Sequence, residues 1–163
     1  QFVATVGGDD KQWFLVASDA GYGFQVQYAD LLANKKAGKS LLNLPKGAKV
    51  LKPARITDVE KDTVVAISNE GRMLRFPLKD LPALSRGKGN KIIGIPGKRV
   101  EAREEFVVVV ACVPENGSLT IYSGKRHMTL KPADLEHFNG ERGRRGSKLP
   151  RGFQRVEGFQ VES

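Results

Sequence analysis

Short apolar runs alternate with polar turns along the whole chain. In Phe24-Gln25-Val26 and Leu74-Arg75-Phe76 the apolar residues occupy every second position, which places them on one face of a strand. Phe106–Val113 is apolar throughout and predicts an inner strand that is buried on both faces. No stretch has the period of a long amphipathic helix. The pattern predicts an all-β chain with strands at Phe2–Val6, Trp13–Ala17, Phe24–Tyr28, Lys49–Ile56, Thr63–Ile67, Met73–Phe76, Lys91–Ile95, Phe106–Cys112, Leu119–Tyr122, His127–Leu130 and Phe153–Val161.

The same order of features occurs three times. Each copy has an apolar run, a glycine turn, a second strand, an Asp-Leu pair and a loop of glycine and basic residues. Several short strands in a repeat of about 40–50 residues are typical of a propeller-like array of four-stranded blades. We therefore expect about three blades in one domain over 1–163, with repeats of roughly 1–48, 49–98 and 99–163. The turn glycines are Gly21, Gly71 and Gly117, and the Asp-Leu pairs begin at Asp30, Asp80 and Asp134.

Two kinds of segment complete the predicted repeat. Each Asp-Leu pair is expected to form one helical turn with Asp as its N-cap, over Asp30–Ala33, Asp80–Leu84 and Asp134–Phe138. The charged segments Thr57–Asp62 and Lys98–Glu105 are expected to connect one copy to the next.

Charge and cysteine content narrow the class of protein. The chain has 27 Lys and Arg against 18 Asp and Glu, a net charge of +9, which favours a polyanionic partner. Its single cysteine, Cys112, excludes an internal disulfide framework and fits a reducing compartment. No apolar stretch is long enough to span a bilayer and no signal peptide is visible, so we expect a cytoplasmic protein without membrane insertion. Because the sequence begins at Gln1 without Met, we expect it to be a fragment of a longer subunit.

Three basic glycine loops, in chain order Lys35–Lys39, Ser85–Lys91 and Glu141–Lys148, carry the candidate chemistry. Glycine lets a backbone turn through positive φ and approach a surface closely, and the flanking Lys, Arg and N–H groups can meet phosphate oxygens. One such loop alone is better interpreted as a solvent-exposed turn. Its recurrence in three copies favours a row of cationic contacts on a rim. Such a row suits a long, curved polyanion. The candidate contacts are Lys35, Lys36, Lys39, Arg86, Lys88, Lys91, Lys125, Arg126, Arg142, Arg144, Arg145, Lys148, Arg151 and Arg155.

Four segments resemble a known family. ASDAGYGF, NEGRMLRFP, SRGKGNKIIGIP and GERGRRG look like the C-terminal DNA-binding domain of the A subunit of bacterial DNA topoisomerase IV, which is related to the corresponding domain of gyrase. The resemblance covers essentially the whole chain. It implies a β-pinwheel, a propeller-like disc whose blades exchange strands and whose rim bends duplex DNA. The basic residues above would then contact phosphates, with little dependence on base sequence.

The same resemblance implies a larger enzyme around this domain. Its parent is an ATP-dependent type IIA topoisomerase that decatenates and relaxes DNA, a heterotetramer of A and B subunits associated with the nucleoid. The cleavage tyrosine and the Mg²⁺ site lie elsewhere in the enzyme and the ATPase is the B subunit, so no catalytic residue, metal or cofactor is expected here. Gly140–Gly146 and Ser85–Lys91 are degenerate relatives of the heptapeptide on which gyrase wrapping depends. Bending and recognition of supercoils or catenanes are therefore expected in preference to chiral wrapping.

Two alternatives remain open. A propeller-like protein-interaction module without DNA binding would show an exposed apolar patch. A nucleotide-dependent enzyme would use 33–40, which fits a permissive P-loop pattern, but Pro45 leaves no room for the helix that a P-loop opens. The tyrosines are interpreted as strand residues and Cys112 as a small buried hydrophobe.

Overall fold

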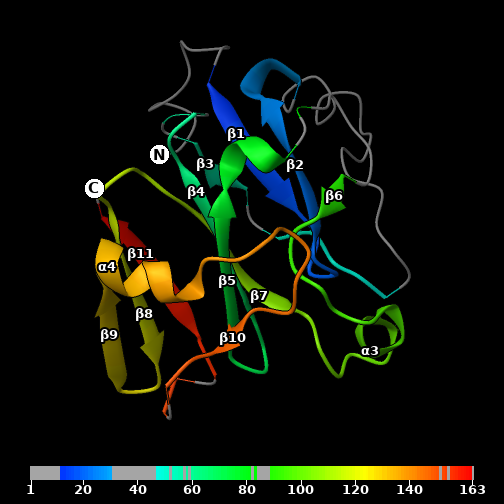
Figure 1. The fold of residues 1–163 in the computed structure, drawn as a ribbon. Coiled ribbons are helices and arrows are strands. Elements are labelled where there is room, and N and C mark those ends of the chain that lie inside the picture. The colour runs from blue at the N-terminus through cyan, green and yellow to red at the C-terminus, as the bar shows by residue number, and fades with distance from the viewer. Residues whose placement is uncertain are drawn as a thin grey trace.

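Short strands make up most of the regular structure (Figure 1). The computed structural model describes residues 12–30, 47–51, 53–56, 58, 60–81, 83, 89–150, 152–153 and 155–162. Within these ranges the elements are β1 (Trp13–Ala17), β2 (Tyr22–Gln27), β3 (Ala54–Arg55), β4 (Thr63–Ser68), β5 (Arg72–Pro77), η1 (Leu78–Asp80), β6 (Asn90–Lys91), α3 (Gly97–Glu101), β7 (Val107–Val113), β8 (Ser118–Ser123), β9 (Arg126–Leu130), α4 (Pro132–Leu135), η2 (Glu136–Phe138), β10 (Ser147–Lys148) and β11 (Gly158–Glu162).

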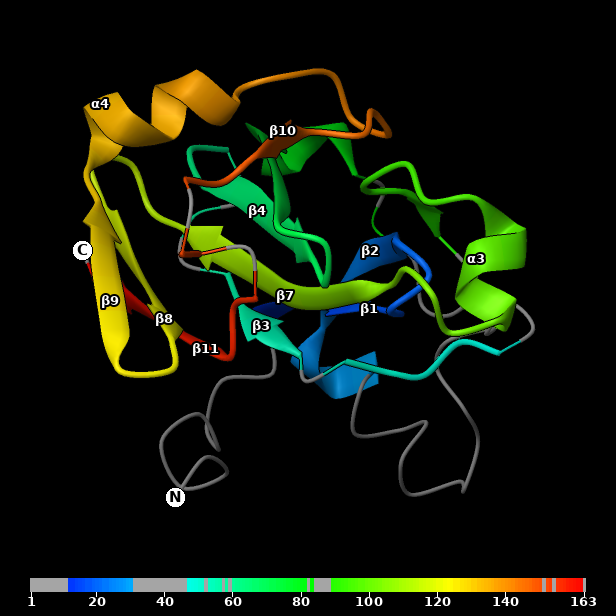
Figure 2. The ribbon, with the colours of Figure 1, turned by 90° about the horizontal axis from the view of Figure 1, so that it is seen from below.

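The strands form three antiparallel sheets that follow one another across the molecule (Figure 2). Their strand orders are β3-β1-β2-β6, β10-β5-β4-β7 and β11-β8-β9. The predicted all-β array of about three blades is confirmed. Two blades have the expected four strands, whereas the third has three strands among the described residues.

Each four-stranded sheet combines a hairpin with strands from the following repeat. In the first sheet, β6 pairs with β2, so that Lys91 lies opposite Tyr22. In the second sheet, β10 pairs with β5, so that Ser147 lies opposite Met73. β6 and β10 both belong to basic glycine loops. The blades therefore exchange strands, as the family resemblance implied, and each exchanged strand fastens a basic loop to the preceding blade.

The third hairpin turns at Lys125 and Arg126, as predicted, but its turn glycine is not the one that the repeat alignment indicated. The sequence aligned Gly117 with the turn glycines Gly21 and Gly71, but β7 before Gly117 pairs with β4 of the second sheet. The third hairpin is β8–β9, and it turns at Gly124. An apolar strand and a glycine turn look alike whether the next strand continues the same sheet or starts a new one. The pairing partner, which is distant in sequence, decides between them.

The predicted inner strand is buried on both faces but is not central in its sheet. Val109, Ala111 and Val113 belong to the apolar cluster between the second and third sheets, while Val110 and Cys112 belong to the cluster between the first and second. β7 nevertheless ends the strand order of its sheet, with β4 as its paired neighbour. Packing of neighbouring sheets against both faces, rather than two flanking strands, explains its apolar sequence.

Helical turns lie at two of the Asp-Leu pairs, but neither begins at its Asp and Asp is not their N-cap. η1 is capped by Pro77 and ends at Asp80, and α4 is capped by Lys131. Asp134 is the third residue of α4, and its Oδ2 accepts the backbone N–H of Lys131 at 3.1 Å. This is the reciprocal half of a capping box, so the carboxylate stabilises the helix start from inside the first turn. The first predicted turn lies mostly outside the described residues, with 28–30 helical.

The segments between hairpins contain less strand than predicted. Lys49–Ile56 contributes only β3, and Lys91–Ile95 contributes only Lys91, at the end of β6. The predicted connector Lys98–Glu105 begins inside α3, a short helix that the sequence pattern does not predict. These segments pass from one sheet to the next, so only two residues at a time meet a partner strand. The predicted strand Phe2–Val6 lies outside the described residues.

Candidate nucleic-acid interface

The structure describes eight of the fourteen predicted contacts. All of the first loop's candidates, and Arg86 and Lys88 of the second loop, lie outside the described residues, as does Arg151. The ones that can be placed come from the end of the second loop, the third loop, the third hairpin and the segment before β11. They are Lys91, Lys125, Arg126, Arg142, Arg144, Arg145, Lys148 and Arg155.

The third loop lies directly along the end of the second loop. Residues 142–145 run beside residues 91–94, and four hydrogen bonds join the two segments. Arg142 Nη1 donates to Lys91 O at 2.8 Å, Gly143 N to Ile92 O at 3.0 Å, Gly94 N to Arg144 O at 2.8 Å, and Arg145 Nη1 to Gly94 O at 3.0 Å. The third loop is therefore joined to the described end of the second loop and to the residues that follow it. We call residues 91–94 and 142–145 the joined loops.

The described glycines of these loops make close contacts between blades. Gly89 has φ +82°, and a Cβ there would lie 2.2 Å from the carbonyl oxygen of Gly23 in β2. Gly146 has φ +81°, and a Cβ there would lie 2.6 Å from the carbonyl oxygen of Met73 in β5. A side chain would clash in both places, and positive φ disfavours any residue but glycine. In this part of the chain, glycine brings the loop backbone against the preceding blade.

Arg145 points inward and holds the third loop in place. Its Nη1 lies 3.0 Å from Oε1 of Glu105, a carboxylate that is only 1% exposed. Arg99 of α3 contacts the same oxygen at 3.3 Å and also pairs with Glu70 in the β4–β5 turn. A buried carboxylate needs such partners because desolvation penalises its charge. Arg145, predicted as a phosphate contact, is thus engaged in an internal ion pair.

Arg142, Arg144 and Lys148 are better placed for an external ligand. Arg144 pairs with Glu141 at 3.2 Å, but both side chains are more than two-thirds exposed, and such surface pairs contribute little. Arg142 uses Nη1 to anchor the loop on Lys91 O. Lys148 is exposed in β10. These three side chains extend along the third loop from the first blade to the second.

The third hairpin brings a second group of basic residues together. Lys125 and Arg126 lie exposed at the β8–β9 turn, and Arg155 is exposed before β11. The Arg126 guanidinium lies against Gly152, where a Cβ would come within 2.4 Å of its Nη1. In the same turn, Gly124 N donates to Glu157 Oε1 at 2.6 Å. The turn and the segment before β11 are therefore adjacent.

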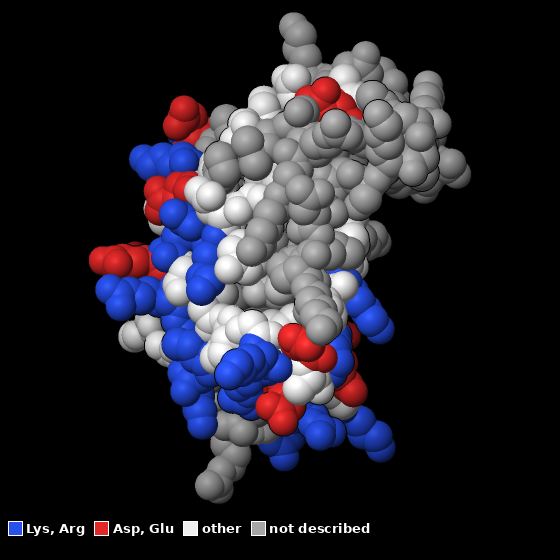
Figure 3. Space-filling view, turned by 90° about the vertical axis from the view of Figure 1, so that its right-hand side faces the viewer, with Lys and Arg blue, Asp and Glu red and all other residues white. Residues whose placement is uncertain are grey.

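Figure 3 looks onto the side of the molecule that carries α3. Lys and Arg side chains gather down one edge and across the lower part of this face, with Asp and Glu side chains among them. A groove of about 770 Å³ lies here between α3 and the joined loops. Lys98 of α3 lines it together with Lys91 and Arg144. Sequence reasoning missed Lys98 because it lies in a segment interpreted as a connector.

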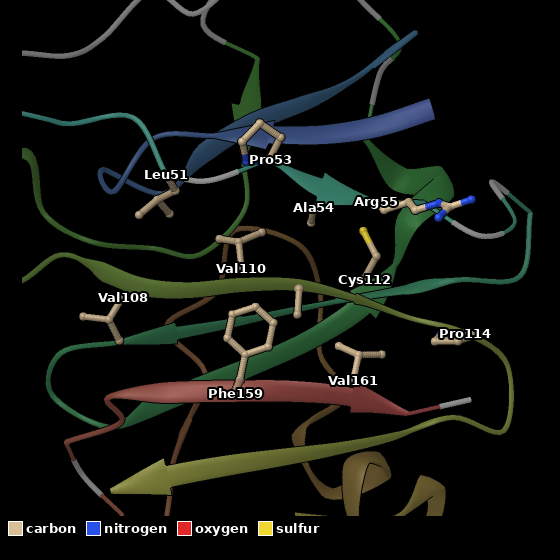
Figure 4. A pocket seen from close by; sticks show the side chains of 11 residues that line it. Leu51, Pro53, Ala54, Arg55, Val108, Val110, Cys112, Pro114, Phe159 and Val161 are labelled. Atoms are coloured by element: carbon tan, nitrogen blue, oxygen red, sulfur yellow. The ribbon is translucent and has the colours of Figure 1, made fainter. Parts of the chain in front are cut away.

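A second, more apolar hollow lies where β3, β7 and β11 meet (Figure 4). Its volume is about 440 Å³, and Leu51, Val108, Val110 and Phe159 are among its lining residues. Phe159 is 42% exposed, the kind of feature that a protein-interaction surface would have.

Cys112 borders this hollow but is buried. Burial raises the pKa of its thiol well above the ordinary value, and the nearby charge of Asp62 adds to the effect. The interpretation of Cys112 as a small buried hydrophobe is confirmed.

Among the described residues, no three His, Cys, Asp or Glu side chains are grouped to hold a metal ion. No helix in the described part of the chain is long and apolar enough to cross a membrane.

Comparison with protein families agrees with this architecture. The family of the DNA gyrase C-terminal domain, a beta-propeller, matches residues 12–57 and 62–114. The chain belongs to this family. The resemblance inferred from the glycine and arginine motifs is thereby confirmed. The matched ranges of this gyrase-type C-terminal domain include the first two hairpins and the crossing strand β7.

Curated relatives of the gyrase-type domain are named as A subunits of DNA topoisomerase 4. The protein from Pseudomonas aeruginosa is 55% identical over 154 residues, which is 94% of this chain and 20% of that protein. The one from Haemophilus influenzae is 51% identical over 91% of this chain, and the one from Escherichia coli K12 is 47% identical over 94%. The chain spans about a fifth of the length of these relatives.

Solved structures of C-terminal domains superpose on this gyrase-type domain. The E. coli ParC C-terminal domain superposes with a TM-score of 0.85 at 46% identity, over 95% of this chain and 62% of that one. The DNA gyrase A C-terminal domain superposes with a TM-score of 0.72 at 19% identity, over 94% of this chain and 50% of that one. The gyrase likeness, at this identity, shows a shared fold.

Proposed function

We propose that this domain binds and bends duplex DNA, with little dependence on base sequence, as a substrate-recognition part of a type IIA topoisomerase. The observation that carries the proposal is the joining of the third basic loop to the end of the second, which makes a surface across two blades. Arg142, Arg144 and Lys148 present their charges along this surface, while Arg145 and the glycines hold it against the blades.

This arrangement suits a phosphate backbone. Lys and Arg side chains can neutralise successive phosphates without reading bases, and a curved row of such contacts favours DNA that follows the curve. Arg142 and Arg144 can each offer a planar guanidinium to two phosphate oxygens. The Arg144–Glu141 pair can open to do so, since an exposed pair of this kind is worth less than about 1 kcal/mol.

The surrounding enzyme is part of the same proposal. Relatives named as A subunits of DNA topoisomerase 4 are 46–55% identical to this chain over the aligned residues. This similarity supports a place for the domain in such an enzyme. We infer that its partners are the rest of the A subunit together with the ATPase, the B subunit, and that ATP and Mg²⁺ act in those parts. The domain would work in the bacterial cytoplasm, at the nucleoid.

Titration of a fluorescent duplex of about 40 base pairs over a range of KCl concentrations tests DNA binding. If roughly six to ten phosphates are engaged, affinity should fall by about 10³–10⁵ between about 50 and 200 mM salt. Charge reversal in the Arg142→Glu, Arg144→Glu double variant should weaken binding at least tenfold, with an unchanged far-UV circular dichroism spectrum. Binding that does not depend on salt would contradict the proposal.

The handedness of any bend is tested separately. Nicked plasmid ligated around the domain traps any change in linking number. We expect binding with a small trapped linking difference, because the basic heptapeptides are degenerate. A large difference of one sign would instead indicate chiral wrapping.

A protein-interaction module is the second candidate, and the apolar hollow around Phe159 favours it. It predicts that Phe159→Asp abolishes association with a protein partner while DNA affinity stays as in the parent. In the absence of any salt-dependent DNA binding, this alternative becomes the better account.

A further inference from the structure

The groove between α3 and the joined loops lies beside the proposed DNA-binding surface and shares residues with it. Tyr22 contributes to its lining from β2, and Ile95 from the segment that follows the joined loops. Lys98 lines it from α3, and Arg144 lines it from the third loop. Because Arg144 also belongs to the outward row of the third loop, a ligand on that row reaches the groove without a break.

The charge in the groove is mostly positive. Among its described lining residues, Lys91, Lys98, Arg144 and Arg145 are cationic, and Glu101 is the acidic residue. Arg145 is engaged by Glu105, and Arg144 has an exposed partner in Glu141. The Lys91 ammonium lies 5.9 Å from the centre of the Tyr22 ring, a contact that leaves its hydrogen-bond donors available.

Lys98 is the groove's most available charge. Its side chain is exposed, and within the described part of the chain no hydrogen bond or ion pair engages its ammonium group. The rest of α3 is firmly held, since Arg99 pairs with Glu105 and Val100 is buried. A lysine on a fixed helix loses less conformational entropy on binding than a lysine on a mobile loop.

The walls of the groove also suit a polymer better than a small molecule. A Cβ at Gly97 would meet no atom within 4 Å, so this wall is low and open. At Gly143 a Cβ would lie 3.6 Å from Cδ of Lys91, so the opposite wall is formed by backbone and the lysine stem. An open, cationic groove continuous with a basic surface is accessible to a backbone phosphate of a duplex that lies on that surface.

We infer that this groove binds a phosphate group of the DNA backbone, with Lys98 and Lys91 as its principal cations. The inference rests on the proposed function and extends the DNA path from the loops onto α3. It adds Lys98 to the contacts expected from sequence. The ligand is a duplex backbone phosphate, recognised by charge and without base readout.

The test compares Lys98→Ala with Lys61→Ala in the same salt titration. Lys61 is also exposed, but it lies away from the groove. It precedes β4, whereas the turn at the other end of the β4–β5 hairpin carries Glu70, the residue that pairs with Arg99 of α3. Loss of one phosphate contact should lower the slope of log affinity against log salt by about 0.9 and weaken binding about eightfold at 0.1 M salt. Lys61→Ala should change neither quantity, and Lys98→Arg should keep the parent slope.

Separate outcomes contradict the groove and the proposed function. If the parent domain binds DNA and the Arg142, Arg144 double variant weakens it, but Lys98→Ala binds with the parent's affinity and slope, the groove inference alone fails. Weaker binding by Lys98→Ala with an unchanged salt slope also overturns it, because no phosphate contact was lost. If the parent domain shows no salt-dependent binding, the proposed function itself fails.

Discussion

Arg145 and Glu105 form an ion pair at 3.0 Å between the third loop and the start of β7, and the Glu105 carboxylate is 1% exposed. The pair lies 40 residues apart in sequence. Through Arg99 and Glu70 the same carboxylate connects α3 and the β4–β5 turn. An arginine in a dense basic cluster is thus engaged in holding the cluster to the fold.

The first prediction separates this structural arginine from its neighbour Arg144. Arg145→Ala should lower the free energy of unfolding by about 1–3 kcal/mol, because it removes one of two partners from a buried carboxylate while Arg99 remains. Arg144→Ala breaks an exposed pair and should change stability by less than about 0.5 kcal/mol. Urea unfolding measures both. Equal stability of the two variants would contradict the assignment.

The second prediction concerns Glu141. Its carboxylate engages Arg144 at the surface and repels an approaching phosphate. Glu141→Gln should therefore raise DNA affinity by about two- to fivefold at low salt, and the gain should shrink as salt screens the charge. Fluorescence anisotropy at two salt concentrations measures it. Glu115→Gln, at the exposed turn between β7 and β8, is the matched control and should leave affinity unchanged.

The third prediction tests the role of the loop glycines. Gly146→Ala places a Cβ 2.6 Å from the Met73 carbonyl oxygen at φ +81°, so it should destabilise the domain by more than about 1 kcal/mol. Gly97→Ala, where a Cβ meets nothing within 4 Å and the residue begins α3, should be neutral or stabilise by up to about 1 kcal/mol. Thermal unfolding of the two variants compares them directly. If Gly146 served only DNA contact, Gly146→Ala would leave the stability of the domain as unchanged as Gly97→Ala does.

The fourth prediction follows from the raised pKa of Cys112. Since burial keeps the thiol protonated in the folded state, a thiol reagent at pH 8 should react with the denatured chain and not with the native one. The unfolded thiol ionises above a pH of roughly 8.5, whereas the folded one does not. The unfolded state therefore binds fewer protons there, and stability should fall as pH rises beyond that value. Cys112→Ala should remove this part of the pH dependence, as urea unfolding at pH 7 and pH 10 would show.

The hairpins could be predicted closely from sequence, and the crossings between blades could not. Trp13–Ala17 was predicted as it is found, because local alternation and a tight glycine turn specify a hairpin. β10, by contrast, is two polar residues, Ser147 and Lys148, inside a loop. They form a strand only because β5 offers an edge with which to pair. The local sequence contains no pattern that predicts such a strand.

The candidate site shows the same division. The sequence indicated a basic surface, and it identified Arg144 and Lys148, which are exposed in the structure, and Arg142, which is half-buried beside Lys91. It could not tell that Arg145 faces a buried carboxylate, because Glu105 is remote in sequence and unremarkable among the charges of a connector. It also passed over Lys98, whose position depends on how α3 packs beside the third loop.

By itself, the sequence determined the repeat, the all-β class, the family and the excess of positive charge, because these depend on local residue order and composition. Only the tertiary structure decided which strands cross between blades, that the third loop is joined to the end of the second, and that Arg145 pairs with a buried carboxylate. Those features depend on backbone hydrogen bonds and ion pairs between residues 40 or more positions apart, such as Arg142 with Lys91 and Arg145 with Glu105. Partners at that separation are selected when the blades pack, and one residue's neighbours along the chain do not reveal them.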